Sequence, residues 1–264
     1  MLGSFTSPTV PRPTATAQPA SRGARIPIVA ESPDWIIIDK PPLLQVHPSK
    51  PSDSATMWHL LRDLLVYELV NGGQVSIINR LDRETSGLVL IAKTKPAARH
   101  FSMQMERGAI AKQYLALVSG WPAADHFTID EPLLRQGIHL PSRIYLKQCV
   151  HPAGFPSRTT FQVERRFIRN DFPFAQVRAF PATGRMHQIR VHLAHAGHPV
   201  IGDKIYGPSE ENYLTFIQTG WTPALAKTLL LPRHALHSAV LEIPGDNLRW
   251  QSPLPPDLAA FATP

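Results

Sequence analysis

Proline is the residue that most constrains how this chain can fold. The 264 residues include 27 prolines, about twice the share that is usual in globular proteins. Proline lacks a backbone N–H and disrupts the interior of a helix. The chain is therefore expected to be rich in loops, with strands and turns rather than long helices.

The remaining composition excludes several classes of protein. No apolar run approaches the roughly 18–20 residues that a membrane-spanning helix needs, although the 43% of hydrophobic residues suffices for a large core. Cys149 is the single cysteine, which excludes intramolecular disulfides and thiolate cages for zinc or iron–sulfur clusters. The 27 Lys and Arg against 20 Asp and Glu give a net charge of +7, which favours a polyanionic partner.

Residues 1–25 differ from the rest of the chain. They hold prolines among Thr, Ser and Ala, no acidic residue, and three arginines, Arg12, Arg22 and Arg25. Such a segment cannot bury enough apolar surface to offset its ordering entropy, and it lacks the apolar stretch of a secretory signal. We expect a disordered basic arm, followed by a single folded domain over residues 26–264.

The hydrophobic patterning of the folded part predicts many strands and a few helices. Helices are expected at 57–68, with Asp53 or Ser54 as N-cap, at 96–106 and at about 185–196. The segment 209–231, with Phe216 and Trp221, is expected to pack against the domain rather than to face a substrate. Strands are expected at 35–39, 75–78, 88–92, 113–118, 160–169, 174–180 and 235–242. This order favours an α+β domain with a mixed, mainly antiparallel sheet flanked by helices and loops.

The loop between two of these strands carries the densest run of charge, Asn79-Arg80-Leu81-Asp82-Arg83-Glu84. Neighbouring guanidinium groups lower the pKa of a carboxylate such as Asp82, which can then serve as nucleophile or base. A solvated surface ion-pair network explains the same residues on spacing alone. A further alternative is a glycosidase or nucleoside hydrolase in which Asp82 and Glu84 serve as the acid and the base.

A second polar run is Gly184-Arg185-Met186-His187-Gln188-Ile189-Arg190-Val191-His192. On the predicted helix, His187 and Arg190 share one face. Four histidines lie at positions 187, 192, 195 and 198, which raises the question of a metal site. The spacing of five between the first two is poor for one helical face, and no carboxylate ligand accompanies them. We therefore predict no metal site here.

Taken together, these segments resemble the RluA-type family of RNA pseudouridine synthases. The motifs, in the family's order, are Asp39-Lys40-Pro41-Pro42, Arg80-Leu81-Asp82 with Thr85-Ser86-Gly87-Leu88, Lys112-Gln113-Tyr114-Leu115-Ala116, the run 184–192, Gly197 to Asp203, and Arg233 to Ser238. The resemblance extends from about Ile26 to Phe261. One position departs from the family pattern, because Asn79 stands where the family has His. Asn also donates and accepts hydrogen bonds, so activity is expected to survive.

The resemblance implies a role for individual residues. Asp82 matches the essential aspartate, Tyr114 the tyrosine that stacks on the base and is implicated in proton transfer, and Arg190 the arginine that pairs with the carboxylate. Further substrate contacts are expected from Arg80, which would fill the space left by a flipped uridine, from Leu88 and Ile189 as an apolar wall, and from Arg185 and His187.

The implied reaction isomerises specific uridines of structured RNA to pseudouridine. It needs no metal, nucleotide or redox cofactor, and the uridine must first leave its stack. The expected partner is ribosomal or transfer RNA, and the expected protein is a cytoplasmic monomer without a membrane contact or a separate RNA-binding domain. Two alternatives remain at this point: a non-catalytic RNA-binding protein on the same fold, and the nucleoside or glycoside hydrolase.

Overall fold

The computed structural model describes residues 26–48 and 56–263. The expected arm and the expected helix caps Asp53 and Ser54 lie outside these ranges. The elements are, in chain order, β1 (Ile28–Glu31), β2 (Trp35–Lys40), α1 (Met57–Leu64), α2 (Val66–Val70), β3 (Ser76–Ile77), β4 (Ser86–Ala92), α3 (Lys95–Glu106), β5 (Ala111–Ser119), β6 (His126–Asp130), β7 (Leu133–Arg135), α4 (Gln136–His139), β8 (Gln148–Val150), β9 (Arg158–Arg169), β10 (Phe172–Pro181), α5 (Gln188–His195), α6 (Glu211–Thr219), α7 (Pro223–Leu229), β11 (Leu236–Ile243), the short 3-10 helix Pro244–Asp246, β12 (Leu248–Gln251) and α8 (Pro256–Ala262).

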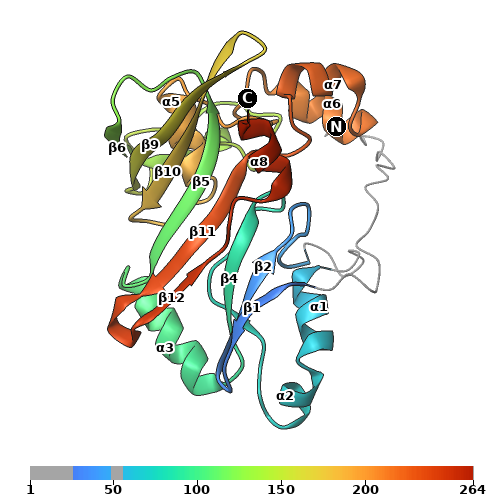
Figure 1. Cartoon of the computed structure of the whole chain (residues 1–264), viewed down its shortest axis with the longest axis vertical. Coiled ribbons are helices and arrows are strands. Elements are labelled where there is room, and N and C mark those ends of the chain that lie inside the picture. Colours follow the sequence, from blue (N-terminus) through green and yellow to red (C-terminus); the bar gives the residue numbers. More distant parts are fainter. Residues whose placement is uncertain (1–25, 49–55, 264) are drawn as a thin grey trace, which may run out of the picture.

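One large sheet runs the length of the molecule (Figure 1). Its strand order is β1-β2-β4-β11-β5-β10-β9-β6, with β3 paired to β4 and β12 to β11. The pairs are antiparallel except β4 with β11, which run parallel over two residue pairs. A separate two-stranded sheet joins β7 and β8. The predicted α+β class with a mixed, mainly antiparallel sheet is confirmed.

The lower half of the sheet, as drawn in Figure 1, is covered on both faces. Ile36 and Ile38 of β2 belong to the same buried cluster as Leu61 of α1, whereas Ile37 packs with Phe101 of α3 on the opposite face. Figure 1 shows α1 and α3 on either side of β2 and β4. A strand buried on both faces reads as an uninterrupted apolar run, which explains why this strand was predictable.

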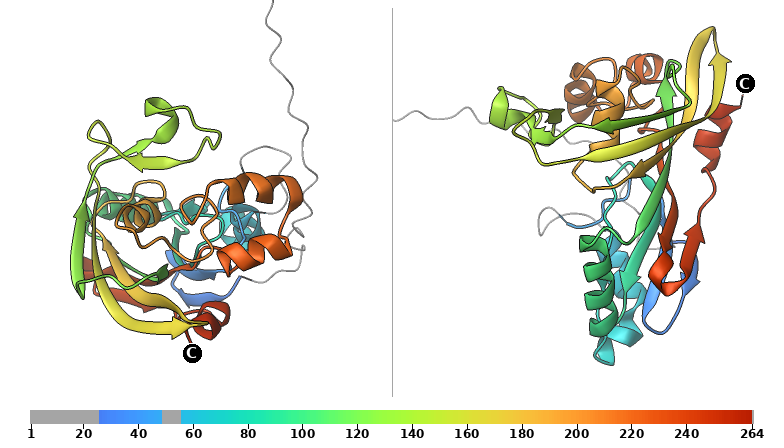
Figure 2. Two further views of the ribbon diagram at one scale, coloured as in Figure 1. Left: turned by 90° about the horizontal axis from the view of Figure 1, so that it is seen from above. Right: turned by 90° about the vertical axis from the view of Figure 1, so that its left-hand side faces the viewer.

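The upper half of the sheet carries α8 on one side and α5 on the other (Figure 2). Phe261 of α8 meets Phe174 edge-on, with ring centroids 5.4 Å apart, and Phe167 at 6.4 Å. Ile189 and Leu193 of α5 join the large cluster from their own side. The amino-terminal end of α5 therefore rests on a rigid, packed support.

The first helix differs from the prediction in its start and its length. It begins after Thr56, whose backbone N–H donates to Nδ1 of His59 at 3.2 Å, so that Thr56 and not Asp53 or Ser54 precedes the helix. At Leu65 the backbone leaves helical geometry, with φ −101° and ψ 29°, and this divides the predicted helix into α1 and α2. Leu65 is buried in the same cluster as Met57 and Leu61. The second helix ends at Val70, two residues beyond the predicted end at 68.

The segment 209–231 forms α6 and α7. Only α7 buries side chains, Leu225 and Leu229, whereas α6 buries none and Trp221 stays exposed. Tyr213 and Leu214 of α6 are only partly buried, but they pack against the cluster that contains Val191 and Ile205. The expectation that this segment packs on the domain is therefore confirmed for both helices. None of the helices in the described ranges is long and apolar enough to cross a membrane.

Candidate active site

A cleft of about 810 Å³ opens where four segments meet. They are the loop between β3 and β4, the end of α3, the start of β5, and the connection from β10 to α5. Of the residues predicted for a site, seven line it: Arg80, Asp82, Tyr114, Arg185, His187, Ile189 and Arg190. The fold thus gathers side chains that lie more than a hundred positions apart in sequence.

Leu88 is the exception among the predicted site residues. Its side chain is fully buried in the cluster between β4 and α3, and it does not line the cleft. Side chains alternate along a strand, and position 88 of β4 faces α3. Leu236, at the start of β11, lines the cleft together with Ile189.

Asn79 fixes the start of the loop that carries Asp82. Its amide donates to the carbonyl of Leu88 at 3.0 Å and accepts the backbone N–H of Leu90 at 2.8 Å. The side chain is buried, so both hydrogen bonds are shielded from water. Asn79 donates and accepts as expected, but its partners belong to β4 and not to the loop itself.

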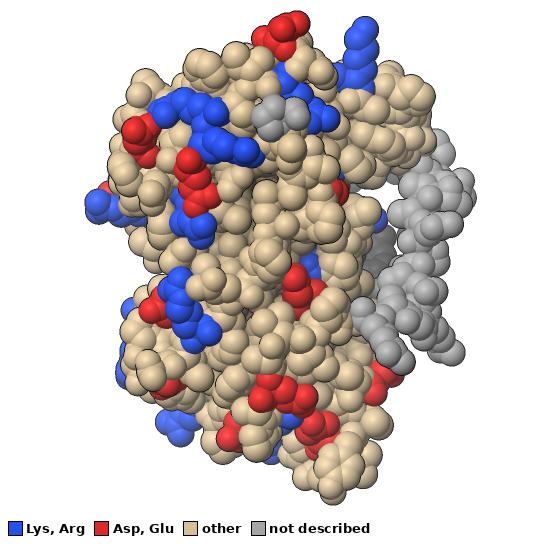
Figure 3. Space-filling view, viewed as in Figure 1, with Lys and Arg blue, Asp and Glu red and all other residues tan. Residues whose placement is uncertain are grey.

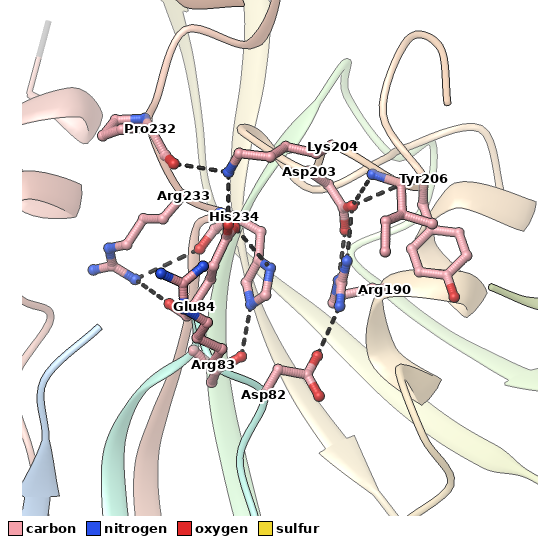
Figure 4. Close-up of polar contacts among 12 residues, drawn as sticks. Asp82, Arg83, Glu84, Arg190, Asp203, Lys204, Tyr206, Pro232, Arg233 and His234 are labelled. Carbon is pink, nitrogen blue, oxygen red and sulfur yellow. Dashed lines mark hydrogen bonds and ion pairs between the residues drawn. The ribbon is translucent and has the colours of Figure 1, made fainter. Parts of the chain in front are cut away.

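Asp82, Arg190 and Asp203 are joined by consecutive ion pairs (Figure 4). Its Oδ2 accepts from Nη1 of Arg190 at 2.8 Å. The same guanidinium makes a two-pronged contact with Asp203, from Nε at 2.6 Å and from Nη2 at 2.9 Å. Asp203 also accepts the backbone N–H groups of Ile205 and Tyr206. Bidentate pairs fix a guanidinium in orientation as well as in position.

These contacts determine the protonation states of Asp82 and Asp203. Burial raises the pKa of Asp82, but the positive charges that His187, Arg190 and His234 carry in acid outweigh it and lower the pKa to about 2. Burial opposes the charge of Asp203 too, yet Arg190 holds its pKa well below the usual range. Asp82 is consequently an ionised carboxylate at neutral pH, with 29% of its side chain exposed to the cleft.

His187 does not lie on a helix, contrary to the prediction. The helix α5 starts at Gln188, three residues later than expected, and His187 precedes it with a left-handed backbone, φ 58°. The cause is the Gln188 side chain, whose Oε1 accepts from the N–H of Arg185 at 3.0 Å and from the hydroxyl of Thr183 at 2.7 Å. This turn aims Nε2 of His187 at Asp82, 3.9 Å from Oδ2.

Tyr114 enters the cleft from β5. It is paired in register with Ser238 of β11, and 8% of its surface is exposed. Burial, together with the negative charge of Asp82, raises the pKa of Tyr114 to about 12. The phenol is therefore protonated at neutral pH.

Arg80 and Arg185 are exposed at the mouth of the cleft. The guanidinium of Arg185 lies over the ring of Phe155, 5.6 Å from its centroid, and donates to the carbonyl of Pro156 at 3.3 Å. Within residues 26–48 and 56–263, neither arginine forms an ion pair. Their charge is available to a ligand that enters the cleft.

Glu84 is turned away from Asp82. Its carboxylate accepts from Nζ of Lys204 at 2.7 Å and from the backbone N–H of His234 at 3.1 Å, as Figure 4 shows. The hydroxyl of the adjacent Thr85 lies 2.7 Å from Nε2 of His234. Glu84 therefore anchors the loop, and it is not placed as the second carboxylate of a hydrolase.

Sequence reasoning missed Asp203, Lys204, Tyr206 and His234. The turn 202–207 reads as a plain glycine-bounded loop, and nothing in local spacing links it to Arg190. One of the histidines considered for a metal, His192, is engaged otherwise: its Nδ1 lies 3.0 Å from the hydroxyl of Thr159, and its Nε2 3.0 Å from the carbonyl of Glu131. In the described part of the chain, no three His, Cys, Asp or Glu side chains are grouped to hold a metal ion.

Comparison with known proteins gives one consistent result. Residues 34–195 match the family model of RNA pseudouridylate synthases. The chain is 36% identical over 243 residues to ribosomal large subunit pseudouridine synthase D of Nitrosomonas europaea, covering 89% of this chain and 63% of that protein. For the protein of the same name from Escherichia coli the identity is 35%, over 88% of this chain and 68% of the relative.

A solved structure shares the fold. The human RNA pseudouridylate synthase domain containing 1 superimposes with a TM-score of 0.67 at 25% identity, covering 89% of this chain and 87% of the human chain.

Proposed function

Because the chain belongs to the RNA pseudouridylate synthase family, we propose that it converts uridines of large-subunit ribosomal RNA to pseudouridine. The observation that carries the proposal is the ionised Asp82, held by Arg190 at the floor of a cleft large enough for a nucleotide. The substrate class is supported by relatives that are named for the large ribosomal subunit.

The geometry supports separate tasks for separate groups. Arg190 occupies Oδ2 of Asp82, and no described residue hydrogen-bonds to Oδ1, so that oxygen is the one that acts at the sugar, as nucleophile or as base. Tyr114 offers an aromatic face and a protonated hydroxyl beside it. A uridine must leave its stack to reach them, which costs a few kcal/mol. The exposed Arg80 and Arg185 supply contacts that offset this cost.

The test is to incubate large-subunit ribosomal RNA with the wild-type protein and with Asp82→Asn, and to map pseudouridine by chemical labelling. We expect Asp82→Asn to lose activity by about 10³-fold or more, as loss of a central catalytic group does, while RNA affinity changes by less than about threefold. Asp130→Asn is the matched control, because Asp130 lies in an exposed ion pair with Arg158.

Other outcomes would contradict parts of the proposal. Release of free uracil would identify a hydrolase. Binding without modification by the wild type would identify an RNA-binding protein. Modification of transfer RNA in place of ribosomal RNA would leave the reaction but overturn the proposed substrate.

A further inference from the structure

Behind the cleft, a chain of hydrogen bonds runs from the backbone to His187. The backbone N–H of Gln148, at the start of β8, donates to the hydroxyl oxygen of Tyr206 at 2.8 Å. The same hydroxyl lies 2.8 Å from Nδ1 of His187. The two rings meet edge-on, with centroids 5.6 Å apart. None of these contacts involves Asp82, whose hydrogen-bond donor is Arg190.

The chemistry of these groups fixes where the protons are. A backbone N–H can only donate, so the Tyr206 oxygen accepts from Gln148. Burial raises the pKa of Tyr206, so the hydroxyl keeps its proton. Within the described residues, Nδ1 of His187 is the acceptor within hydrogen-bonding distance of that proton. His187 therefore accepts at Nδ1, and its own ring proton resides on Nε2.

The neutral state of the ring agrees with this assignment. Burial and the neighbouring charge of Arg190 lower the pKa of His187 to about 4, so at pH 7 it carries one ring proton. Nε2 faces the cleft, 3.9 Å from Oδ2 of Asp82. That separation is too long for a direct hydrogen bond, and Oδ2 is already occupied by Arg190. The donor is thus aimed at the cleft, and no residue in the described part of the chain accepts a hydrogen bond from it.

We propose that His187 presents this Nε2–H to an oxygen atom of the uridine bound beside Asp82, and that Tyr206 is the positioning residue that fixes the tautomer. His187 is a hydrogen-bond donor to substrate here, and not a general base. The hydrogen bond to uridine rests on the proposed function, whereas the tautomer assigned to His187 does not.

The left-handed backbone at His187 supplies a matched pair of variants. Asparagine tolerates the left-handed region better than glutamine does, so His187→Asn is favoured by the fold. The amide nitrogen of His187→Gln reaches about as far as Nε2, whereas that of His187→Asn reaches only as far as Nδ1. If the role of His187 were structural, Asn would be the better replacement. If His187 donates from Nε2, Gln is the better replacement.

The first experiment needs no RNA. Long-range proton–nitrogen correlation spectra of the full chain with ¹⁵N-labelled histidine, recorded at pH 7, should show His187 protonated at Nε2. Tyr206→Phe should abolish this preference. A wild-type spectrum with the proton on Nδ1 would overturn the assignment, whether or not the protein is an active synthase.

The second experiment measures kcat/KM on ribosomal RNA. We expect His187→Asn to lose about tenfold, as the loss of one hydrogen bond predicts, and His187→Gln to stay within about threefold of wild type. Full activity of His187→Asn, or equal loss in both variants, would overturn the donor role. If the wild type makes no pseudouridine, the proposed function fails, and the spectra alone decide the tautomer.

Discussion

At the scale of single residues, Asp203 stabilises the fold and the site together. Its side chain is fully buried and carries the two-pronged contact to Arg190. Removing one partner of a buried ion pair costs about 3–5 kcal/mol, because the remaining charge loses its compensation. We expect Asp203→Asn to lower the free energy of unfolding in urea by about 3 kcal/mol. Asp130→Asn, in an exposed pair, should change it by less than 1 kcal/mol; equal effects would contradict the role given to Asp203.

The lowered pKa of His187 predicts how the stability of the folded protein depends on pH. The folded protein keeps this ring neutral down to a pKa of about 4, whereas in the unfolded chain it takes up a proton near 6.5. Between these values the unfolded state binds more protons, so stability falls as the pH falls. From pH 7 to pH 4.5, wild type should lose about 2 kcal/mol more than His187→Gln. Parallel urea midpoints for the two proteins would contradict this prediction.

At the scale of elements, the critical junction is the short parallel contact of β4 with β11. Gly87 has φ +112° and sits opposite Ser238; a Cβ there would overlap the backbone of Ser238. Overpacking costs about 1–3 kcal/mol and the left-handed backbone about 1–2 kcal/mol more. Gly87→Ala should therefore destabilise by about 3 kcal/mol in urea denaturation, and by displacing Ser238 it should also disturb Tyr114.

The control for this junction is Gly137→Ala in α4, where a Cβ meets nothing and φ is ordinary. Such a change is neutral or stabilises by up to about 1 kcal/mol through the unfolded state. A similar loss of stability in both variants would mean that Gly87 is not specially constrained.

The burial pattern of each element explains which strands could be predicted from the sequence. The strands at 35–39, 88–92 and 113–118 were predictable because they are apolar runs buried by the sheet. The strands β1, β6 and β12 are short and half exposed, so their patterns carry little signal. The start of α5 was misplaced because the Gln188 side chain, not helix propensity, decides the conformation of the preceding turn.

The candidate site, too, could be predicted only in part from the sequence. Asp82, Tyr114 and Arg190 stand in recognisable motifs, and the structure brings them to one cleft. Asp203 and Tyr206 were missed because their partners Arg190 and Gln148 lie 13 and 58 positions away, which is beyond any local periodicity. Leu88 was misplaced because the motif gives its position but not the face of β4 that it occupies.

At the scale of the whole molecule, the net charge of +7 forms no single basic face on the side that Figure 3 displays. Figure 3 shows acidic and basic side chains interleaved over the side that it displays. Many arginines are neutralised locally, such as Arg249 by Glu242 and Arg178 by Glu164. The charge that remains available to a polyanion includes Arg80 and Arg185 at the mouth of the cleft.

Salt dependence of RNA binding tests this distribution. Each phosphate contact that a cation makes contributes a slope of roughly −0.7 to −0.9 to a plot of log affinity against log salt. We expect Arg80→Gln with Arg185→Gln to reduce the magnitude of the slope by about 1 to 2, measured by filter binding between 50 and 300 mM salt. Arg249→Gln removes the same charge from an arginine that Glu242 already engages and that does not line the cleft. It should leave the slope unchanged. If all the variants shift the slope in proportion to net charge alone, binding is governed by total charge, and the two arginines at the cleft have no special role.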